Sequence, residues 1–306
     1  MDYSIVVPVY NSEATLPELV ERLDRVLCTM GGKYELILVN DGSLDRSWES
    51  IASLSKRYPW VHGINLMRNY GQHNATLCGI RAAKFDVVIT MDDDLQHPPE
   101  ELPLLLAKLD EGFDVVYGAP KILPKSLLRN WTTKFIKVLL AWVMGVPSVR
   151  NISAFRAFRT HLRDAFATFR SPSVTLDVLL SWGTNRFTSV PVNIEASGRR
   201  SNYRFLTLVK AAMLILTGFS TMPLRFTSLL GFLMTLFGLA IFIYVLVVYF
   251  TAGSLPGFPF LASIISIFGG LQLFALGVFG EYLARMFDRI MDRPTYVVSE
   301  KVGDPQ

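Results

Sequence analysis

Short apolar runs alternate with amphipathic stretches along the first 120 residues of the chain. The apolar runs are rich in Val and Ile, which is typical of buried strands. The stretches between them repeat apolar residues at helical spacing and predict amphipathic helices. This alternation predicts an α/β domain with a mostly parallel sheet and helices on both faces. The predicted strands are 4–10, 34–40, 61–66, 85–90 and 113–118, and the predicted helices are 13–30, 45–57, 72–83 and 99–111.

A second pattern covers the C-terminal part, where no Asp, Glu, Lys, Arg or His occurs between Arg225 and Glu281. As one helix this block would be roughly 80 Å long, against a bilayer hydrocarbon core of about 30 Å. We therefore predict two transmembrane helices, 226–250 and 260–281, separated by a Gly- and Pro-containing break at 251–259. The alternative is a buried hairpin in a large soluble enzyme, but core helices rarely run this long without a charge.

The charges that flank the two spans predict their orientation. Arg225 precedes the first span, Arg285, Arg289 and Arg293 follow the second, and the intervening loop carries no charge. The positive-inside rule then predicts that both termini face the cytoplasm. The N-terminus has neither a basic region nor a cleavage site, so no signal peptide is predicted. The expected organisation is a cytoplasmic domain over 1–204, a juxtamembrane helix over 205–224, the two spans within 225–284, and a cytoplasmic tail over 285–306.

Bulk composition agrees with a membrane protein, since 51% of the residues are hydrophobic, only 18% are charged, and the mean hydropathy is +0.34.

Three polar clusters, at 10–13, 40–43 and 92–94, follow predicted strands. The carboxyl ends of parallel strands meet at one edge of a sheet, where such folds bind ligands. The chain has neither a GxGxxG dinucleotide motif nor a GxxxxGK[ST] P-loop, so its ligand is expected to be bound through acidic residues.

The stretch MDDDLQ places Asp92, Asp94 and Gln96 together. Carboxylates repel a diphosphate, but they can hold it through a hard divalent cation. We therefore predict Mg²⁺ or Mn²⁺ beneath a nucleotide diphosphate. The alternative is that these acids only complement the dipole of the helix after Pro98 and Pro99.

Several motifs make the family resemblance specific: VVPVYNSEATL, VNDGSLD, RNYGQHNA and MDDDLQHPPE. They resemble glycosyltransferase family 2, and more narrowly its membrane-anchored polyprenyl-phosphate sugar transferases. These include dolichol-phosphate mannosyltransferases, bactoprenol glucosyltransferases and undecaprenyl-phosphate formamidoarabinose transferases. The last group also shares RNYGQH, an entry to the first span like TMPLRFTSLLG, and a tail like GEYLARMFDRIMDRPTYVV.

The resemblance implies a GT-A-type catalytic domain and assigns roles to particular residues. The residues implied in nucleotide-sugar binding are Pro8, Tyr10, Glu13, Asp41, Gln72, Asp92, Asp93 and Lys121. Asp94 and Gln96 would be the metal ligands, and Asp92, Asp94 and Arg156 the catalytic residues. The residues implied in binding the lipid phosphate or the diphosphate are Arg129, Arg199, Arg200, Ser201 and Tyr203.

The chain departs from the family at Ala154, where several relatives carry an aspartate that has been proposed as general base. A lipid monophosphate has a second pKa near 6, so at pH 7 it needs positioning and charge compensation more than deprotonation. Arg150, Arg156 and Arg159 could supply that compensation. Asp177 is an alternative acid, although we expect it on a solvated helix face.

The segment from Lys121 to Arg170 carries ten Lys or Arg residues and one acid. Within it, residues 127–145 interleave bases and aromatic residues, which predicts an interfacial helix. A plain packed helix remains the alternative. Nucleic acid is the other use of such a stretch, and the two spans argue against it. Together with residues 205–223, this helix would hold the site against the lipid bilayer.

The sequence thus predicts metal-dependent, inverting transfer of a sugar from a nucleotide diphosphate to a polyprenyl phosphate at the cytoplasmic membrane face. One rival is a processive polysaccharide synthase, which needs a QxxRW motif that this chain lacks. Another is a non-catalytic scaffold that binds nucleotide sugar. UDP-glucose, a UDP-linked amino-arabinose derivative and GDP-mannose stay open as donors, as do the lipid chain length and a homo-oligomeric state.

Overall fold

The computed structural model describes residues 1–121, 152–171, 175–193, 220–252 and 257–303, and the chain divides into two units. The sheet unit contains Met1–Val209 and Asp292–Gln306, and the helical hairpin contains Lys210–Met291. The hairpin is therefore inserted between two parts of the sheet unit. The last residues of the predicted tail, 292–306, belong to the sheet unit, and the last hairpin helix continues to Ile290.

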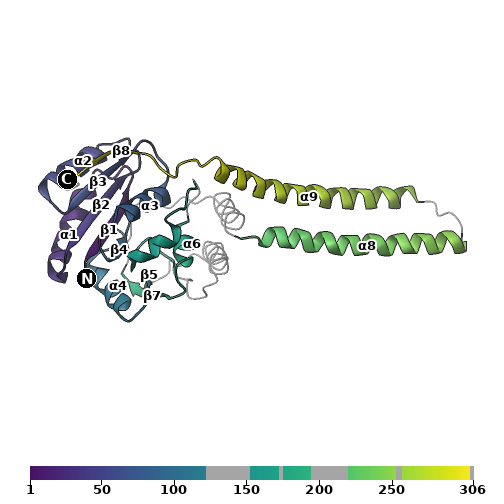
Figure 1. The fold of residues 1–306 in the computed structure, drawn as a ribbon, viewed down its shortest axis with the longest axis horizontal. Coiled ribbons are helices and arrows are strands. Elements are labelled where there is room, and N and C mark those ends of the chain that lie inside the picture. The colour runs from purple at the N-terminus through teal and green to yellow at the C-terminus, as the bar shows by residue number, and fades with distance from the viewer. Residues whose placement is uncertain (122–151, 172–174, 194–219, 253–256, 304–306) are drawn as a thin grey trace. The chain divides into compact units, whose positions relative to one another are not determined.

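The sheet unit is built on eight strands in the order β7-β5-β6-β4-β1-β2-β3-β8 (Figure 1). The pairs β1–β2, β1–β4, β2–β3 and β5–β7 are parallel, and β3–β8, β4–β6 and β5–β6 are antiparallel. The predicted mostly parallel α/β sheet is thus confirmed. The strands are β1 Tyr3–Val9, β2 Tyr34–Asn40, β3 Val61–Leu66, β4 Val87–Thr90, β5 Val115–Pro120, β6 Arg156–Arg159, β7 Phe187–Val192 and β8 Val298–Val302.

Helices cover both faces of the sheet because successive strand residues point to opposite faces. Ile5, Val7 and Val9 of β1 enter one core together with buried leucines of α1 and α4. On the other face α3 approaches so closely that a Cβ at Gly79 would lie 2.3 Å from Cγ1 of Val6. The helices are α1 Leu16–Met30, α2 Ser47–Arg57, α3 Gln72–Ala82, η1 Pro99–Glu101, α4 Leu102–Asp110, η3 Thr160–Phe166 and α6 Leu176–Ser181.

All five predicted strands exist, with ends within two residues of those predicted, and the four predicted helices are also present. The strands β6, β7 and β8 were not predicted. β6 and β8 are short, and β7 contains Pro191, which lowers the strand signal.

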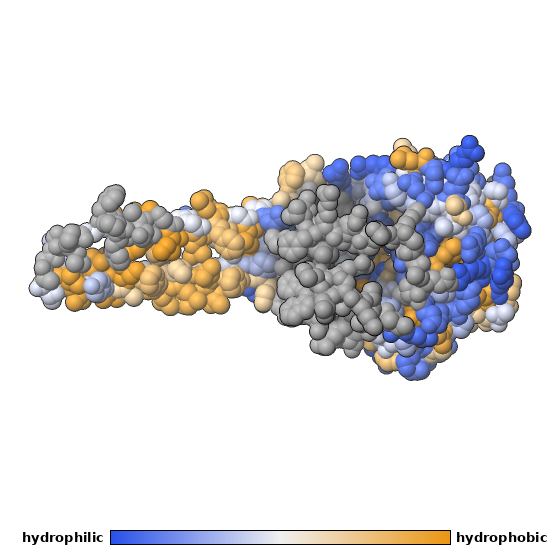
Figure 2. Space-filling view, turned by 180° about the vertical axis from the view of Figure 1, so that it is seen from behind, coloured by the Kyte–Doolittle hydropathy of each residue, from blue (hydrophilic) through white to orange (hydrophobic). Residues whose placement is uncertain are grey.

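The hairpin consists of α8 Met222–Ala252 and α9 Phe258–Ile290, which run side by side (Figure 1). Each contains a segment long and apolar enough to cross a membrane, Met222–Thr251 and Ile267–Phe287. Figure 2 shows hydrophobic residues over the visible face of both helices, and Phe250 and Leu273 are among the most exposed. Hydroxyls of Thr235 and Thr251 donate to backbone carbonyls one turn earlier, so these two donors are satisfied within the helix. These features indicate membrane anchoring, in agreement with the two predicted spans.

The predicted interfacial helix at 127–145 lies outside the described residues, as does most of the juxtamembrane segment 205–224.

Candidate active site

The three polar clusters predicted to converge do so, because β4, β1 and β2 are neighbours in the sheet and their carboxyl ends point the same way. The clusters are also hydrogen-bonded to one another. Asp93 Oδ2 accepts from the backbone N–H of Tyr10 at 3.1 Å and from Ser12 Oγ at 2.5 Å. Asn11 Oδ1 accepts from the backbone N–H of Leu44 at 2.8 Å. The carboxyl edge of the sheet is therefore one connected polar site.

Two adjoining hollows lie at this edge and share Pro8, Gln72 and Asp92. The first, which we call the acidic hollow, has a volume of about 400 Å³. The residues that line it are Pro8, Val9, Tyr10, Asp41, Asn69, Gly71, Gln72, Asp92, Asp93 and Asp94. Seven residues that the family resemblance assigns to nucleotide-sugar or metal binding are in this set.

Asp41, which is 2% exposed, holds the loop between β3 and α3. Its Oδ1 accepts from the backbone N–H of Tyr70 at 2.7 Å, and its Oδ2 accepts from that of Gly71 at 2.8 Å. Burial raises the pKa of Asp41, while these two N–H groups act in the opposite direction. Next to it, a Cβ at Gly42 would lie 2.5 Å from the backbone of Asn69, so only glycine allows this close approach. Asp41 thus shapes one wall of the acidic hollow.

The three consecutive aspartates point to different partners. Asp92 Oδ1 accepts from Gln72 Nε2 at 2.5 Å, while Asp93 is turned toward the end of β1. Asp94 accepts from the backbone N–H of Gln96 at 3.1 Å and also from the Gln96 side chain. Between them, Leu95 has a positive φ of 59°, a strained conformation for a branched residue. This tight turn brings Asp94 and Gln96 together.

Negative charge at this turn is only partly compensated. Burial, together with the neighbouring Asp94 and Asp93, raises the pKa of Asp92 to about 7. A cation at the turn would offset this charge, and the oxygens of Asp94 and Gln96 are of the type that Mg²⁺ and Mn²⁺ prefer. Among the described residues no three His, Cys, Asp or Glu side chains form a metal site by themselves. The donor set therefore fits a metal that takes its other ligands from a bound phosphate group or from water.

The second hollow has a volume of about 300 Å³, and we call it the Arg156 hollow. Its lining residues from β6 and the preceding loop include Arg156 and Ala154, and Asp177 comes from α6. Arg156 is 4% exposed and forms an ion pair with Asp177. Its Nε donates to Thr90 Oγ1 at 3.1 Å, and Tyr117 donates to Asp177 Oδ1 at 2.9 Å. The hollow thus presents a guanidinium whose charge is already balanced by a carboxylate.

The expectation that Asp177 lies on a solvated helix face was wrong. Asp177 is 5% exposed, and α6 is buried along five of its six residues. A helix of six residues is too short to show an amphipathic period, so its neighbours along the chain could not indicate which face Asp177 occupies. The acid lies at the same hollow as Ala154, where the family resemblance had led us to expect one.

Other predicted residues lie outside the two hollows or outside the described chain. Glu13 accepts from the backbone N–H of Arg46 at the start of α2. Lys121 is exposed just after β5, and Arg159 lies at the opposite end of β6 from Arg156, paired in register with Val87. The predicted residues outside the described part of the chain are Arg129, Arg150, Arg199, Arg200, Ser201 and Tyr203.

Sequence reasoning missed Thr90 and Tyr117, which orient Arg156 and Asp177. The available signal was a polar side chain within the otherwise apolar strands VVIT and VVYGAP. It also missed His97, which is 8% exposed and stacks on Phe155 with ring centres 5.3 Å apart. This stacking fixes the chain directly after Gln96.

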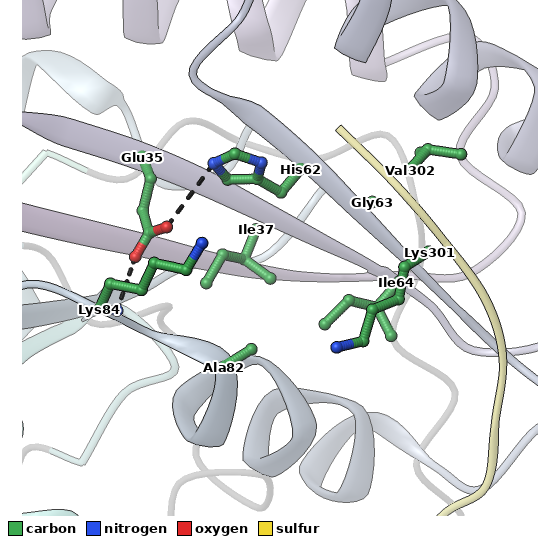
Figure 3. Close-up of a pocket in the computed structure, with 9 residues that line it drawn as sticks. All are labelled: Glu35, Ile37, His62, Gly63, Ile64, Ala82, Lys84, Lys301 and Val302. Carbon is green, nitrogen blue, oxygen red and sulfur yellow. Dashed lines mark hydrogen bonds and ion pairs between the residues drawn. The ribbon is translucent and has the colours of Figure 1, made fainter. Parts of the chain in front are cut away.

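A third, smaller hollow lies at the opposite edge of the sheet, near the amino ends of β2 and β3 (Figure 3). Glu35 accepts there from the backbone N–H of Lys84 and from Ser4 Oγ, and it lies 3.7 Å from His62. No residue predicted to act in the site lines this hollow.

Comparison with solved structures supports the fold. The glucosyl-3-phosphoglycerate synthase of Mycobacterium tuberculosis, in complex with Mn²⁺, UDP-glucose and phosphoglyceric acid, has a TM-score of 0.52 and 19% identity. The match covers 71% of this chain and 79% of that one. At this identity the likeness shows a common GT-A-type fold.

Comparison of sequences extends over the whole chain. An undecaprenyl-phosphate 4-deoxy-4-formamido-L-arabinose transferase of Shewanella sediminis is 37% identical over 303 residues, covering 97% of this chain and 91% of that protein. A Klebsiella pneumoniae protein of the same name is 33% identical, covering 99% and 94%. Glycosyl transferase family 2 matches residues 4–173. The family match and the near full-length similarity to these relatives show that this chain belongs to glycosyl transferase family 2, in agreement with the fold and the site described above.

Proposed function

We propose that this protein transfers a sugar from a nucleotide sugar to undecaprenyl phosphate at the membrane. The observation that carries this proposal is the near full-length similarity to transferases that are named for that acceptor, including the apolar hairpin. The names of those relatives favour a formamido-arabinose residue as the transferred group. A nucleotide-linked pentose of that kind is therefore the first donor to test.

The acidic hollow is our candidate for the nucleotide part of the donor. Tyr10 is 43% exposed at its wall and offers a ring on which a base could stack. Asp41 fixes the opposing loop, and Gln72 orients the carboxylate of Asp92. In this proposal Asp94 and Gln96 hold Mg²⁺ or Mn²⁺, which when bound would neutralise charge on the diphosphate. The Mn²⁺ and UDP-glucose named for the mycobacterial synthase agree with such a site in this fold.

The Arg156 hollow adjoins the acidic hollow and is our candidate for the reacting sugar. An oxygen of the lipid phosphate would form a bond to the anomeric carbon while the bond to the departing nucleotide diphosphate breaks, with inversion. The attacking phosphate is already mostly a dianion at pH 7, so the reaction needs no strong general base. Arg156, held by Asp177 and Thr90, would orient the reacting groups rather than act as a free counter-charge.

The hairpin explains how a lipid acceptor reaches such a site. Two apolar helices of this length would bury their exposed side chains in a bilayer, where the acceptor's hydrocarbon chain also resides. We propose that the sheet unit and both termini lie on the cytoplasmic side, as the flanking arginines predict.

The decisive test is transfer of labelled sugar to undecaprenyl phosphate by the detergent-purified full chain. A non-catalytic scaffold would bind the nucleotide sugar and give no labelled lipid. Asp94→Ala is expected to abolish transfer, whereas Asp110→Ala, the same change on the exposed end of α4, is expected to leave it intact. A transfer rate that survives Asp94→Ala would contradict the assignment of the metal site.

A further inference from the structure

The chain that follows the hairpin, residues 292–303, is built into the sheet unit, and we call it the tail. Its strand β8 pairs antiparallel with β3, with Val302 opposite Gly63 and Val298 opposite Leu66. The contact is close, since a Cβ at Gly63 would lie 2.7 Å from a methyl group of Val302. Trp48 Nε1 also donates to Glu300 at 3.1 Å. The tail is therefore a fixed part of the fold.

The tail also covers one side of α3. Every residue of α3 from Asn74 to Ile80 is buried, so the helix is enclosed on its outer side as well as against the sheet. Arg81 Nη1 lies 3.5 Å from Thr295 Oγ1, and its guanidinium lies 5.8 Å from the centre of the Tyr296 ring. The thiol of Cys78 lies beside Tyr296, and burial raises the pKa of this thiol to about 12. The tail and α3 thus share a packed, hydrogen-bonded contact.

Figure 3 shows the hollow at the amino edge of the sheet, which the end of α3 and β8 both reach. Lys301 and Val302 of β8 line that hollow together with Ala82 at the end of α3. The end of α3 therefore meets the tail at Thr295 and Tyr296, and Ala82 shares a hollow with Lys301 and Val302.

The other end of α3 supplies contacts to the acidic hollow. Gln72, its first residue, donates to Asp92, and the preceding Tyr70 and Gly71 donate their backbone N–H groups to Asp41. Gln72 and Arg81 are about 14 Å apart along the helix axis. Because a helix moves as a stiff body, a shift of α3 at Arg81 also moves the groups that hold both aspartates.

We propose that the tail positions the acidic hollow through α3, with Tyr296 and Arg81 as positioning residues. The inference rests on the proposed function, in which this hollow binds the nucleotide sugar. Loss of the tail contact is expected to weaken donor binding although Tyr296 and Arg81 line neither hollow at the carboxyl edge. The RPTY sequence at 293–296 would serve this contact.

Cys78 provides a direct probe of the tail contact. The chain has two cysteines, of which Cys28 is exposed and Cys78 is buried, so Cys28→Ser leaves one thiol. In that background, Tyr296→Ala is expected to raise the rate of Cys78 modification by a thiol reagent and to raise the KM for the donor, each about tenfold. Binding of UDP with Mn²⁺ is expected to slow Cys78 modification in the Cys28→Ser protein, because coupling between two sites is reciprocal.

Two further variants separate positioning from general destabilisation. Tyr58→Ala removes a half-buried tyrosine of the same size from the end of α2 and is expected to change neither readout. Tyr296→Leu keeps an apolar side chain at this position but removes the ring beside Arg81. It is the second variant if Tyr296→Ala does not fold, and it is expected to raise the donor KM in the same way.

The outcomes distinguish this inference from the proposed function. If the parent protein transfers sugar and Tyr296→Ala exposes Cys78 while the donor KM is unchanged, the tail only stabilises the fold and the inference is wrong. Unchanged Cys78 modification in Tyr296→Ala would overturn it as well. A parent protein that transfers no sugar to undecaprenyl phosphate would instead overturn the proposed function.

Discussion

Arg156 of β6 and Asp177 of α6 form an ion pair beneath the hollow that Asp92 also lines. Their side chains are only 4% and 7% exposed, so each charge depends on the other. The pair joins β6 to α6 at the point where we place the reacting sugar.

Removal of one partner should be far more costly than removal of both. We expect Asp177→Ala to lower the free energy of unfolding by about 3–5 kcal/mol, because it leaves a buried guanidinium without its counter-charge. Arg156→Met with Asp177→Leu should recover most of that stability. Denaturant unfolding in detergent measures both, and Arg170→Ala, in a pair exposed by 69% and 59%, is a control expected to cost less than about 1 kcal/mol. Equal losses for the single and the double variant would contradict this account of the pair.

Asp41→Asn tests whether Asp41 shapes the acidic hollow. The asparagine can accept one backbone N–H, but its NH₂ group would face the other, which leaves a buried donor unpaired at a cost of about 1–3 kcal/mol. We therefore expect the affinity for UDP with Mn²⁺ to fall roughly tenfold or more, measured by titration calorimetry. Asp110→Asn, on the exposed end of α4, should bind as the parent does. An unchanged affinity in Asp41→Asn would show that the loop position does not matter for binding.

Ala154→Asp tests the need for a general base. We expect no gain in transfer at pH 7.5, because the lipid phosphate is already mostly deprotonated. A new carboxylate in the hollow that Asp92 lines would also repel the phosphate. Initial rates at saturating donor provide the measurement. A gain of tenfold or more would mean that the reaction is limited by a missing base.

The proposed topology places the break between α8 and α9 outside the cytoplasm. Thr251→Cys, at the exposed end of α8, should react with a membrane-impermeant maleimide in intact cells. The native Cys28 of the sheet unit is the internal control and should react only after permeabilisation. The reverse pattern would contradict the orientation.

The sequence predicted the parts of the structure that repeat a local pattern. β1 and β2 are mostly apolar, and α8 and α9 are too long and apolar for a soluble core, so their types follow from composition and period. The sequence also predicted that Asp41 and Asp92 lie at the same edge of the sheet, because both follow parallel strands whose carboxyl ends meet there.

Local sequence patterns could not predict the pairings between distant segments of the chain. β8 exposes Ser299, Glu300 and Lys301, so nothing in its sequence distinguishes an edge strand from a solvated tail until β3 is beside it. The partnership of Arg156 with Asp177, 21 residues apart, likewise depends on where α6 packs. These contacts form only when the chain folds. The ion pair with Asp177 also determines that the guanidinium charge of Arg156 is already balanced before a substrate binds.

The most direct test of the proposed function is transfer by the detergent-purified full chain, with Mn²⁺ or Mg²⁺, from a panel of labelled donors to undecaprenyl phosphate. The panel contains a UDP-linked formamido-arabinose, UDP-glucose and GDP-mannose. The account predicts one labelled lipid product, formed from one donor, lost with EDTA and lost in Asp94→Ala. Metal-dependent binding of a donor without any labelled lipid, from every donor tested, would contradict it.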